Sequence, residues 1–277
     1  MHACYRHPGR ETGRSCAICK RPVCLDCLSE LGLGAVCPAC KKLWDKPKTG
    51  LSRAVWKLRS LPSGPVLTLG LIVTNIAVFG AQLMQAGVSI WEPNPYFVDG
   101  AVSVSTIAAE PWRIGASAFV HLNFVHLLSN MLMLWYVGLA VEAVVPRVQY
   151  ILVYGVALVG GSLGAILLQP DAATAGASGA IFGLTAAGAV VLRTRGGQVA
   201  QAYQGLLLGL LLVNLFYTFS KPDISVGGHL GGAAIGLLAG LIFSEAGPAR
   251  RLSYIWSTLL VLGVGAAVLI VTIAVAP

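Results

Sequence analysis

A serine and a histidine stand in glycine-rich stretches of an otherwise apolar sequence. Ser178 lies between Gly176 and Gly179, and His229 follows Gly228. A hydroxyl nucleophile and an imidazole base form a pair that could carry out acyl transfer. Polar and ionisable side chains are costly in a bilayer and usually line a functional cavity. The pair therefore indicates chemistry carried out within the membrane.

A second group of polar residues stands earlier in the chain, at the start of another apolar stretch. His126 and Asn130 are four residues apart, so they share one face of a helix and could point into a common cavity. His121 is rotated well away from that face. We expect His121 to be a structural histidine that hydrogen-bonds a loop or a neighbouring helix.

All seven cysteines lie within residues 4–40, where they and one histidine form four pairs with two-residue gaps. The pairs are Cys4/His7, Cys16/Cys19, Cys24/Cys27 and Cys37/Cys40. Both side chains of such a pair can reach one metal ion, so the eight ligands are enough for two tetrahedral zinc sites. The odd number of thiols argues against a disulfide framework.

We expect both zinc ions to be structural, because protein side chains fill every coordination position. The ligand order resembles a B-box-like or cross-brace finger, which would join the first pair to the third and the second to the fourth. Pairing of consecutive ligands stays open. With so few apolar residues, this segment could hardly fold without metal. A cytoplasmic protein is a candidate partner of this module.

The composition bounds the fold class. The chain has 277 residues, of which 56% are hydrophobic and 11% charged, and its mean hydropathy is +0.76. These values lie outside the range of a soluble domain. Seven apolar runs are each near the ~20 residues that cross a bilayer as a helix. They cover residues 66–86, 119–141, 148–168, 175–193, 204–219, 226–244 and 253–275. The sequence thus predicts an all-α polytopic membrane protein.

The charges predict the domain organisation and the topology. We expect a zinc module at 1–42, a basic linker at 43–65, a six-helix membrane core at 66–244 and a seventh helix within 245–277. Of the 19 Lys and Arg residues, 12 precede the first apolar run, which places the N-terminus in the cytoplasm and the C-terminus outside. The net charge of +8 then reflects topology and contact with anionic lipid, and we expect no nucleic-acid partner. Short loops favour a bacterial plasma membrane.

Small residues recur at every fourth position in the fourth and sixth apolar runs. The two sets are Gly179, Gly183 and Ala187, and Gly228, Gly232, Gly236 and Gly240. Stripes of small residues let helix backbones approach closely in lipid, where packing and hydrogen bonds hold helices together. This pattern explains how the fourth and sixth helices could bring the serine and the histidine together.

The depth of the polar residues supports the same grouping. Under the predicted topology, His126, Ser178 and His229 each lie within about two turns of the start of their helix, at a similar level near the outer face. Three positively polarised helix ends converge there, which would favour a developing oxyanion. Glu142 is near the inner end of its helix, too far away to complete a triad. We therefore expect a Ser–His dyad.

The segment from about Pro111 to Phe243 resembles the rhomboid family of intramembrane serine proteases. The matching motifs are, in order, Trp112-Arg113, His121-x4-His126-x3-Asn130, Gly176-Ala177-Ser178-Gly179 with Gly183, and Gly228-His229 followed by glycines. The resemblance implies a six-helix core, and the seventh helix and the zinc module resemble additions found on some members.

The resemblance also implies roles for these residues. Ser178 would be the nucleophile, and His229 would be its general base and later the acid that protonates the leaving amine. The backbone N–H of Ser178 and the side chains of His126 and Asn130 would hold the oxyanion.

Other matched residues would be structural: Trp112 and Arg113 in the long loop, and Gly176 and Gly179 around the nucleophile. Phe182 stands where some members have a tyrosine that stacks on the catalytic histidine, so we expect it to support His229.

The implied substrate is another single-span transmembrane protein, cut near the outer membrane face, and the catalysis would need no cofactor. Two alternatives stay open. A rhomboid-like pseudoprotease would bind membrane proteins without cleaving them, but both dyad positions are intact. A transporter or channel could use His126 and His229 as a polar path, but it leaves the Gly-Ala-Ser-Gly motif unexplained.

Overall fold

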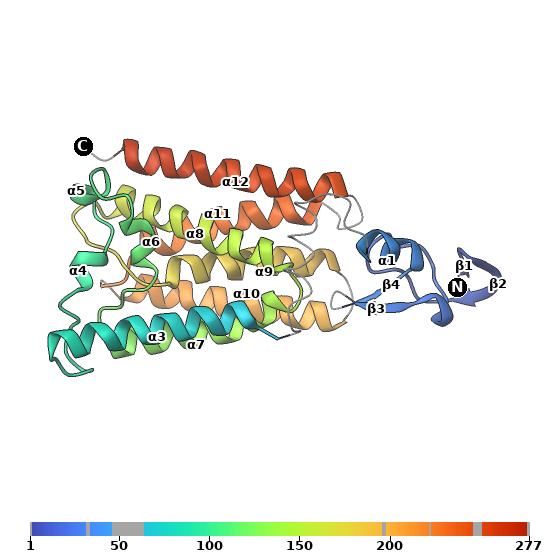
Figure 1. The fold of residues 1–277 in the computed structure, drawn as a ribbon, viewed down its shortest axis with the longest axis horizontal. Coiled ribbons are helices and arrows are strands. Elements are labelled where there is room, and N and C mark those ends of the chain that lie inside the picture. Colours follow the sequence, from blue (N-terminus) through green and yellow to red (C-terminus); the bar gives the residue numbers. More distant parts are fainter. Residues whose placement is uncertain are drawn as a thin grey trace.

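The computed structural model describes residues 2–31, 34–45, 64–195, 198–221, 223–245 and 251–275. Figure 1 shows long helices that run side by side, with the N-terminal segment beyond one end of the bundle. The linker proposed at 43–65 lies mostly outside the described residues.

The N-terminal segment is built from short elements around its cysteines. They are β1 (His2–Cys4), β2 (His7–Thr12), the 3-10 helix η1 (Leu25–Cys27), β3 (Ser29–Leu31), β4 (Gly34–Val36) and α1 (Pro38–Asp45). β1 pairs antiparallel with β2, and β3 with β4. Val23 and Val36 are buried, but most of the buried side chains are thiols. This core is too small to hold the segment together by hydrophobic burial alone.

The rest of the described chain is helical, with seven long helices. They are α3 (Val66–Ala86), α7 (Phe124–Glu142), α8 (Arg147–Leu168), α9 (Ser178–Arg195), α10 (Gln198–Ser220), α11 (Val226–Glu245) and α12 (Arg251–Ala274). Each overlaps one predicted apolar run. Among the described residues, six of them are long and apolar enough to cross a bilayer. The chain is therefore a multi-pass membrane protein, as the composition predicts.

α9 is the exception among these helices. Its apolar part, Ser178–Thr194, is shorter than the six spans, although the sequence predicts a full crossing at 175–193. With 18 residues and a rise of ~1.5 Å per residue, α9 is about 27 Å long, just under the ~30 Å hydrocarbon core. Its start at Ser178 is set by the preceding turn, where Gly176 has a φ of +123°.

Glycine faces hold α9 against α11. A Cβ atom added to Gly232 would lie 2.1 Å from the carbonyl oxygen of Gly179, and one added to Gly236 would lie 2.3 Å from Cα of Gly183. Backbones this close leave no room for a side chain, so the predicted stripe is confirmed. A second stripe escaped the sequence analysis: a Cβ on Gly231 would lie 2.2 Å from the carbonyl oxygen of Gly160 in α8. α11 therefore packs by glycine on two sides.

Glu142, the last residue of α7, contacts the first turn of α3. Its carboxylate accepts hydrogen bonds from the backbone N–H groups of Leu67 and Thr68, at 3.0 and 2.8 Å, and from Oγ1 of Thr68 at 2.7 Å. These N–H groups have no partner within their own helix, so the carboxylate caps α3 from another helix. Glu142 lies 16 residues after His126, about 24 Å along α7. That separation agrees with its exclusion from the polar cluster.

The chain between α3 and α7 folds back on itself instead of forming an open loop. It contains three short helices, α4 (Phe97–Gly100), α5 (Val104–Ile107) and α6 (Arg113–Ser117). Ile107 and Ile114 are buried with Ile166 of α8 in a small apolar cluster. This segment therefore packs on the bundle near the end where α9 begins.

The glycine contacts give a direct test of the packing. We expect Gly236→Ala to lower the unfolding midpoint in detergent, because its methyl group would overlap the backbone of Gly183; overpacking of this kind typically costs about 1–3 kcal/mol. Gly209→Ala in α10 is the matched control, since a Cβ there meets nothing within 4 Å and alanine favours the helix. Thermal unfolding of both variants should separate them, and equal midpoints would contradict the proposed contact.

Candidate functional site

Ser178 and His229 line the same cavity. It has a volume of about 630 Å³ and lies between α7, α8, α9, α10, α11 and the segment that precedes α9. His126, Asn130 and Thr218 are also part of its wall. The tertiary structure thus gathers polar side chains from four helices around one space within the helix bundle.

Ser178 is the first residue of α9, and the segment before it is held from outside. Thr174 and Val102 exchange two backbone hydrogen bonds of 2.8 Å, and the N–H of Gly176 donates to the carbonyl oxygen of Ser117 at 2.7 Å. Ser117 ends α6, so the α4–α6 region fixes the turn that presents Ser178. At a helix start, free N–H groups and the helix dipole favour negative charge near this residue.

His229 lies in the first turn of α11 and is almost fully buried. Its ring stacks on Phe182, with centroids 4.2 Å apart and an interplanar angle of 15°. Phe182 is one turn after Ser178, so this stack places the imidazole beside the same face of α9 that carries the serine. This stack agrees with the support expected from Phe182, whose role at the site stays a prediction.

His126 and Asn130, on α7, lie beside Gly176 in the turn that precedes Ser178. A Cβ on Gly176 would lie 2.8 Å from Nε2 of His126 and 3.9 Å from Nδ2 of Asn130, so only glycine fits here. Nδ1 of His126 accepts from the backbone N–H of Leu122 at 3.4 Å. A neutral imidazole with an accepting Nδ1 carries its proton on Nε2, which leaves an N–H donor on the Gly176 side.

His121 differs from the expectation. α7 begins at Phe124, where the side chain of Asn123 accepts from the N–H of His126, so His121 precedes the helix and is not rotated away on it. Its ring meets that of His126 edge to face, at 5.1 Å. The His121 ring is fully buried, and it interacts with the backbone of Phe119 in the segment before α7. Its hydrogen bond to a loop or a neighbouring helix stays a prediction.

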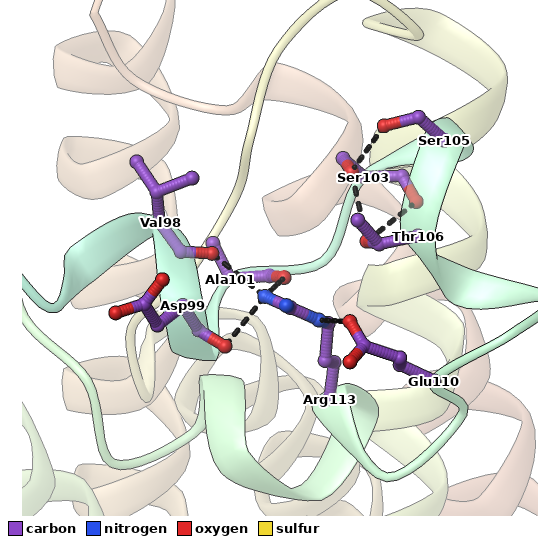
Figure 2. A network of polar contacts seen from close by, with 8 residues as sticks. All are labelled: Val98, Asp99, Ala101, Ser103, Ser105, Thr106, Glu110 and Arg113. Carbon is purple, nitrogen blue, oxygen red and sulfur yellow. Dashed lines mark hydrogen bonds and ion pairs between the residues drawn. The ribbon is translucent and has the colours of Figure 1, made fainter.

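Arg113 ties the short helices together, as Figure 2 shows. Its guanidinium forms an ion pair with Glu110 and donates to the carbonyl oxygens of Val98, at 2.7 Å, and Asp99. Arginine suits this place because its planar fork can serve several acceptors at once. The same guanidinium lies 5.2 Å from the ring centre of the largely exposed Trp112. Arg113 therefore acts on the site only through the segment that it stabilises.

Two separate clusters of candidate metal ligands occur in the N-terminal segment. Cys4, His7, Cys24 and Cys27 form one, and Cys16, Cys19, Cys37 and Cys40 form the other, with the ligand atoms of each cluster within 4.8 Å of one another. This is the cross-brace order, so consecutive pairing is excluded by the structure. Both clusters could hold a metal ion.

The spacing within the clusters fits a tetrahedral ion. The sulfur atoms of Cys19 and Cys37 are 3.7 Å apart, and Nδ1 of His7 is 3.4 Å from the sulfurs of both Cys24 and Cys27. A tetrahedral ion with bonds of ~2.3 Å to sulfur separates two thiolates by about 3.8 Å. Burial raises the pKa of the Cys27 thiol to about 11, so a bound metal would have to displace its proton.

Some site residues escaped the sequence analysis. Oγ1 of Thr218, on α10, is 2.7 Å from Nδ1 of His229. Ser225 caps the start of α11 through the N–H of Gly228, at 3.1 Å, and donates to Gln169 at 2.8 Å. A threonine within an apolar run is common, so nothing in the sequence distinguishes Thr218. Its contact with the histidine on another helix is visible only in the folded structure. Ser225, which precedes α11, carries a recognisable helix-capping signal.

The fold and the cavity define a multi-pass helical membrane protein with a serine and a histidine enclosed between its spans. The sequence profile of the rhomboid domain matches residues 108–246, half of the chain. The chain therefore belongs to the rhomboid family, which contains intramembrane serine proteases and also inactive members. The two N-terminal clusters of candidate metal ligands lie outside the matched region.

Individual relatives agree with this assignment. Rhomboid protease GluP of Bacillus subtilis is 32% identical over 63% of this chain and 34% of its own length. RHOMBOID-like protein 1 of Arabidopsis thaliana is 33% identical over 52% of the chain and 38% of its own length. Putative rhomboid protease YdcA of Bacillus subtilis is 27% identical over 63% of the chain and 86% of its own length. The chain spans little more than a third of the first two relatives.

Proposed function

We propose that the protein is an intramembrane serine endopeptidase with a Ser178–His229 dyad. The observation that carries this proposal is the single cavity that Ser178, His229, His126 and Asn130 share. Rhomboid protease relatives such as GluP of Bacillus subtilis and AarA of Providencia stuartii support the reaction class. The pseudoprotease alternative gains no support from the geometry, because both dyad side chains reach the cavity.

The proposed chemistry follows from the positions of these groups. Nε2 of His229 takes the proton of the Ser178 hydroxyl as Oγ attacks the scissile carbonyl carbon. The C–N bond then breaks, and the imidazolium gives its proton to the leaving amine. Water, deprotonated by His229, attacks the acyl-enzyme ester and releases the new carboxyl end and the Ser178 hydroxyl. The direct contact between Oγ and Nε2 is part of the proposal.

The charge that develops on the carbonyl oxygen needs donors in place before the reaction. We assign this role to Nε2–H of His126, the side-chain amide of Asn130 and the backbone N–H of Ser178. His126 and Asn130 both face Gly176, two residues before the nucleophile. Oriented donors in a site shielded from bulk water stabilise an oxyanion more than water does.

The substrate class proposed is a single-span transmembrane protein, cut near the outer membrane face. Peptide bonds in an intact helix are shielded, so small or helix-breaking residues are expected at the cleavage site. The excess of Lys and Arg before α3 supports a cytoplasmic N-terminus. The reaction would then occur toward the extracytoplasmic side of a plasma membrane.

The N-terminal segment, proposed as residues 1–42, is assigned two structural zinc ions. Seven thiolates and one imidazole, gathered in two clusters of four, favour zinc over harder cations. The membrane core is proposed as 66–244, with the seventh helix in 245–277. No residue of the metal clusters lines the cavity, so zinc is assigned to folding of the module and not to peptide hydrolysis.

Ser178→Ala and His229→Ala should abolish cleavage of a reporter transmembrane substrate in proteoliposomes, because each removes one partner of the proton transfer. A serine-directed fluorophosphonate should label the wild type and leave Ser178→Ala unlabelled. Ser244→Ala, near the end of α11 and outside the cavity wall, serves as the control and should cleave normally. Cleavage by Ser178→Ala at the wild-type rate would identify a different nucleophile.

Asn130→Ala should lower kcat with little change in KM, since the amide is assigned to the transition-state oxyanion. Loss of one such donor costs on the order of 10²–10³ in turnover in serine proteases. Steady-state kinetics in detergent and the unfolding midpoint of the variant would separate this effect from loss of folding. A rise in KM alone would place Asn130 in substrate binding instead.

Elemental analysis of the purified full chain should find two zinc ions per molecule. With cadmium in place of zinc, ¹¹³Cd NMR should show one signal for four thiolates and one for three thiolates and an imidazole. Cys16→Ser should alter the four-thiolate signal, because Cys16 clusters with Cys37 and Cys40. Alteration of the imidazole-containing signal would contradict the ligand clusters described above. Chelation should leave kcat of the membrane core within about a factor of two.

A further inference from the structure

We propose that Thr218 is a positioning residue for the dyad: its hydroxyl holds the His229 ring with the proton on Nδ1 and the lone pair of Nε2 free for Ser178. This inference rests on the proposed function, because it gives that function's general base its orientation. Its evidence is separate, and comes from the placement and hydrogen bonds of one side chain on α10.

Thr218 is buried on a helix whose side chains mostly face outward. It is 1% exposed, whereas its neighbours Tyr217 and Phe219 are 54% and 64% exposed. Within the described side chains of α10, only Leu207 is comparably buried, and the two lie 11 residues apart, about three turns, on one face. Thr218 is therefore the point at which the inward face of α10 reaches the cavity.

A count of protons gives the hydrogen-bond directions. A threonine hydroxyl has one proton to donate and two lone pairs that can accept. The Thr218 hydroxyl donates to the carbonyl oxygen of Asn214, one turn earlier, at 2.7 Å. The contact of 2.7 Å between Oγ1 and Nδ1 of His229 then has the ring N–H as its donor. A neutral imidazole with its proton on Nδ1 has an unprotonated Nε2, the form that a general base needs.

The carbonyl group of Asn214, which accepts the hydrogen bond from Thr218, belongs to a turn that is itself held in place. The side-chain amide of Asn214 donates to its own helix at Leu210, at 2.8 Å, and also contacts the sulfur of Met133 in α7 at 3.3 Å. These bonds fix the turn of α10 that contains Thr218 relative to α7, the helix that carries His126 and Asn130. The hydroxyl thus has a defined position and a defined donor direction.

Phe182 and Thr218 constrain the imidazole in different ways. The stack on Phe182 fixes the plane of the ring, but a ring rotated by half a turn about its Cβ–Cγ bond would stack equally well and would put carbon atoms where Nδ1 and Nε2 now lie. The hydrogen bond to Thr218 selects one of these orientations. In soluble serine proteases a buried carboxylate orients the histidine; a carboxylate is costly within a bilayer, and a neutral hydroxyl that accepts from Nδ1–H performs the orienting part without a buried charge.

The test uses Thr218→Val, which keeps the shape and removes the hydroxyl, and Thr218→Ser, which keeps the hydroxyl. We expect Thr218→Val to lower kcat about 10- to 100-fold, part of the 10²–10⁴ that a general base contributes, with KM and the unfolding midpoint little changed. Thr218→Ser should restore kcat to within about 3-fold of the wild type. Thr272→Val is the matched control: Thr272 is buried on α12 and bonds its own helix at Val268 at 2.7 Å, without a histidine.

A second measurement does not depend on activity. In the wild type with ¹⁵N-labelled histidine, the ring signals of His229, assigned by comparison with His229→Ala, should show a protonated Nδ1 and an unprotonated Nε2. A neutral ring with the proton on Nε2 would overturn the inference, even if Thr218→Val fails to fold. Wild-type kcat in Thr218→Val would do the same.

Different results would contradict the proposed function and the positioning role of Thr218. If the wild type does not cleave any transmembrane reporter and does not react with a fluorophosphonate, the proposed function is wrong. If the wild type cleaves and Thr218→Val cleaves equally well, the function stands and only the positioning role of Thr218 is lost.

Discussion

The contact between the glycine faces of α9 and α11 is the constraint on which the membrane core depends. Ser178 begins one helix and His229 lies in the first turn of the other, so their side chains can share a cavity only if the two backbones nearly touch. A Cβ added to Gly236 would lie 2.3 Å from Cα of Gly183. In lipid no water is released by bringing apolar surfaces together, so close packing has to supply the attraction.

The rest of the core places polar groups where this contact leaves a space. α7 contributes His126 and Asn130, α10 contributes Thr218, and the α4–α6 region holds the turn before Ser178 through Ser117. Glu142 performs a related task at the other end of α7, where it caps α3. His126, Ser117 and Glu142 each accept hydrogen bonds from backbone N–H groups that would otherwise be unpaired among apolar helices.

The N-terminal segment differs from the membrane core in what stabilises it. Its buried side chains are mainly the cysteines that form the two clusters, so the proposed metal coordination, and not burial of apolar surface, would stabilise it. The membrane core depends on backbone contact, and the module depends on ligand geometry. The two parts of the chain therefore respond to different perturbations, chelation for one and loss of glycine for the other.

The sequence by itself determined the membrane spans, the glycine stripe of α9 and α11, the candidate nucleophile and base, and the metal-ligand pairs, because each is a local pattern of period, spacing or composition. Only the tertiary structure decided the cross-brace pairing, the contact of His121 with His126, the second glycine face toward α8 and the bond from Thr218 to His229. Each of these joins residues from separate elements at positions that follow no repeat. An ordinary threonine in an apolar helix acquires its role only when the fold sets its hydroxyl 2.7 Å from an imidazole.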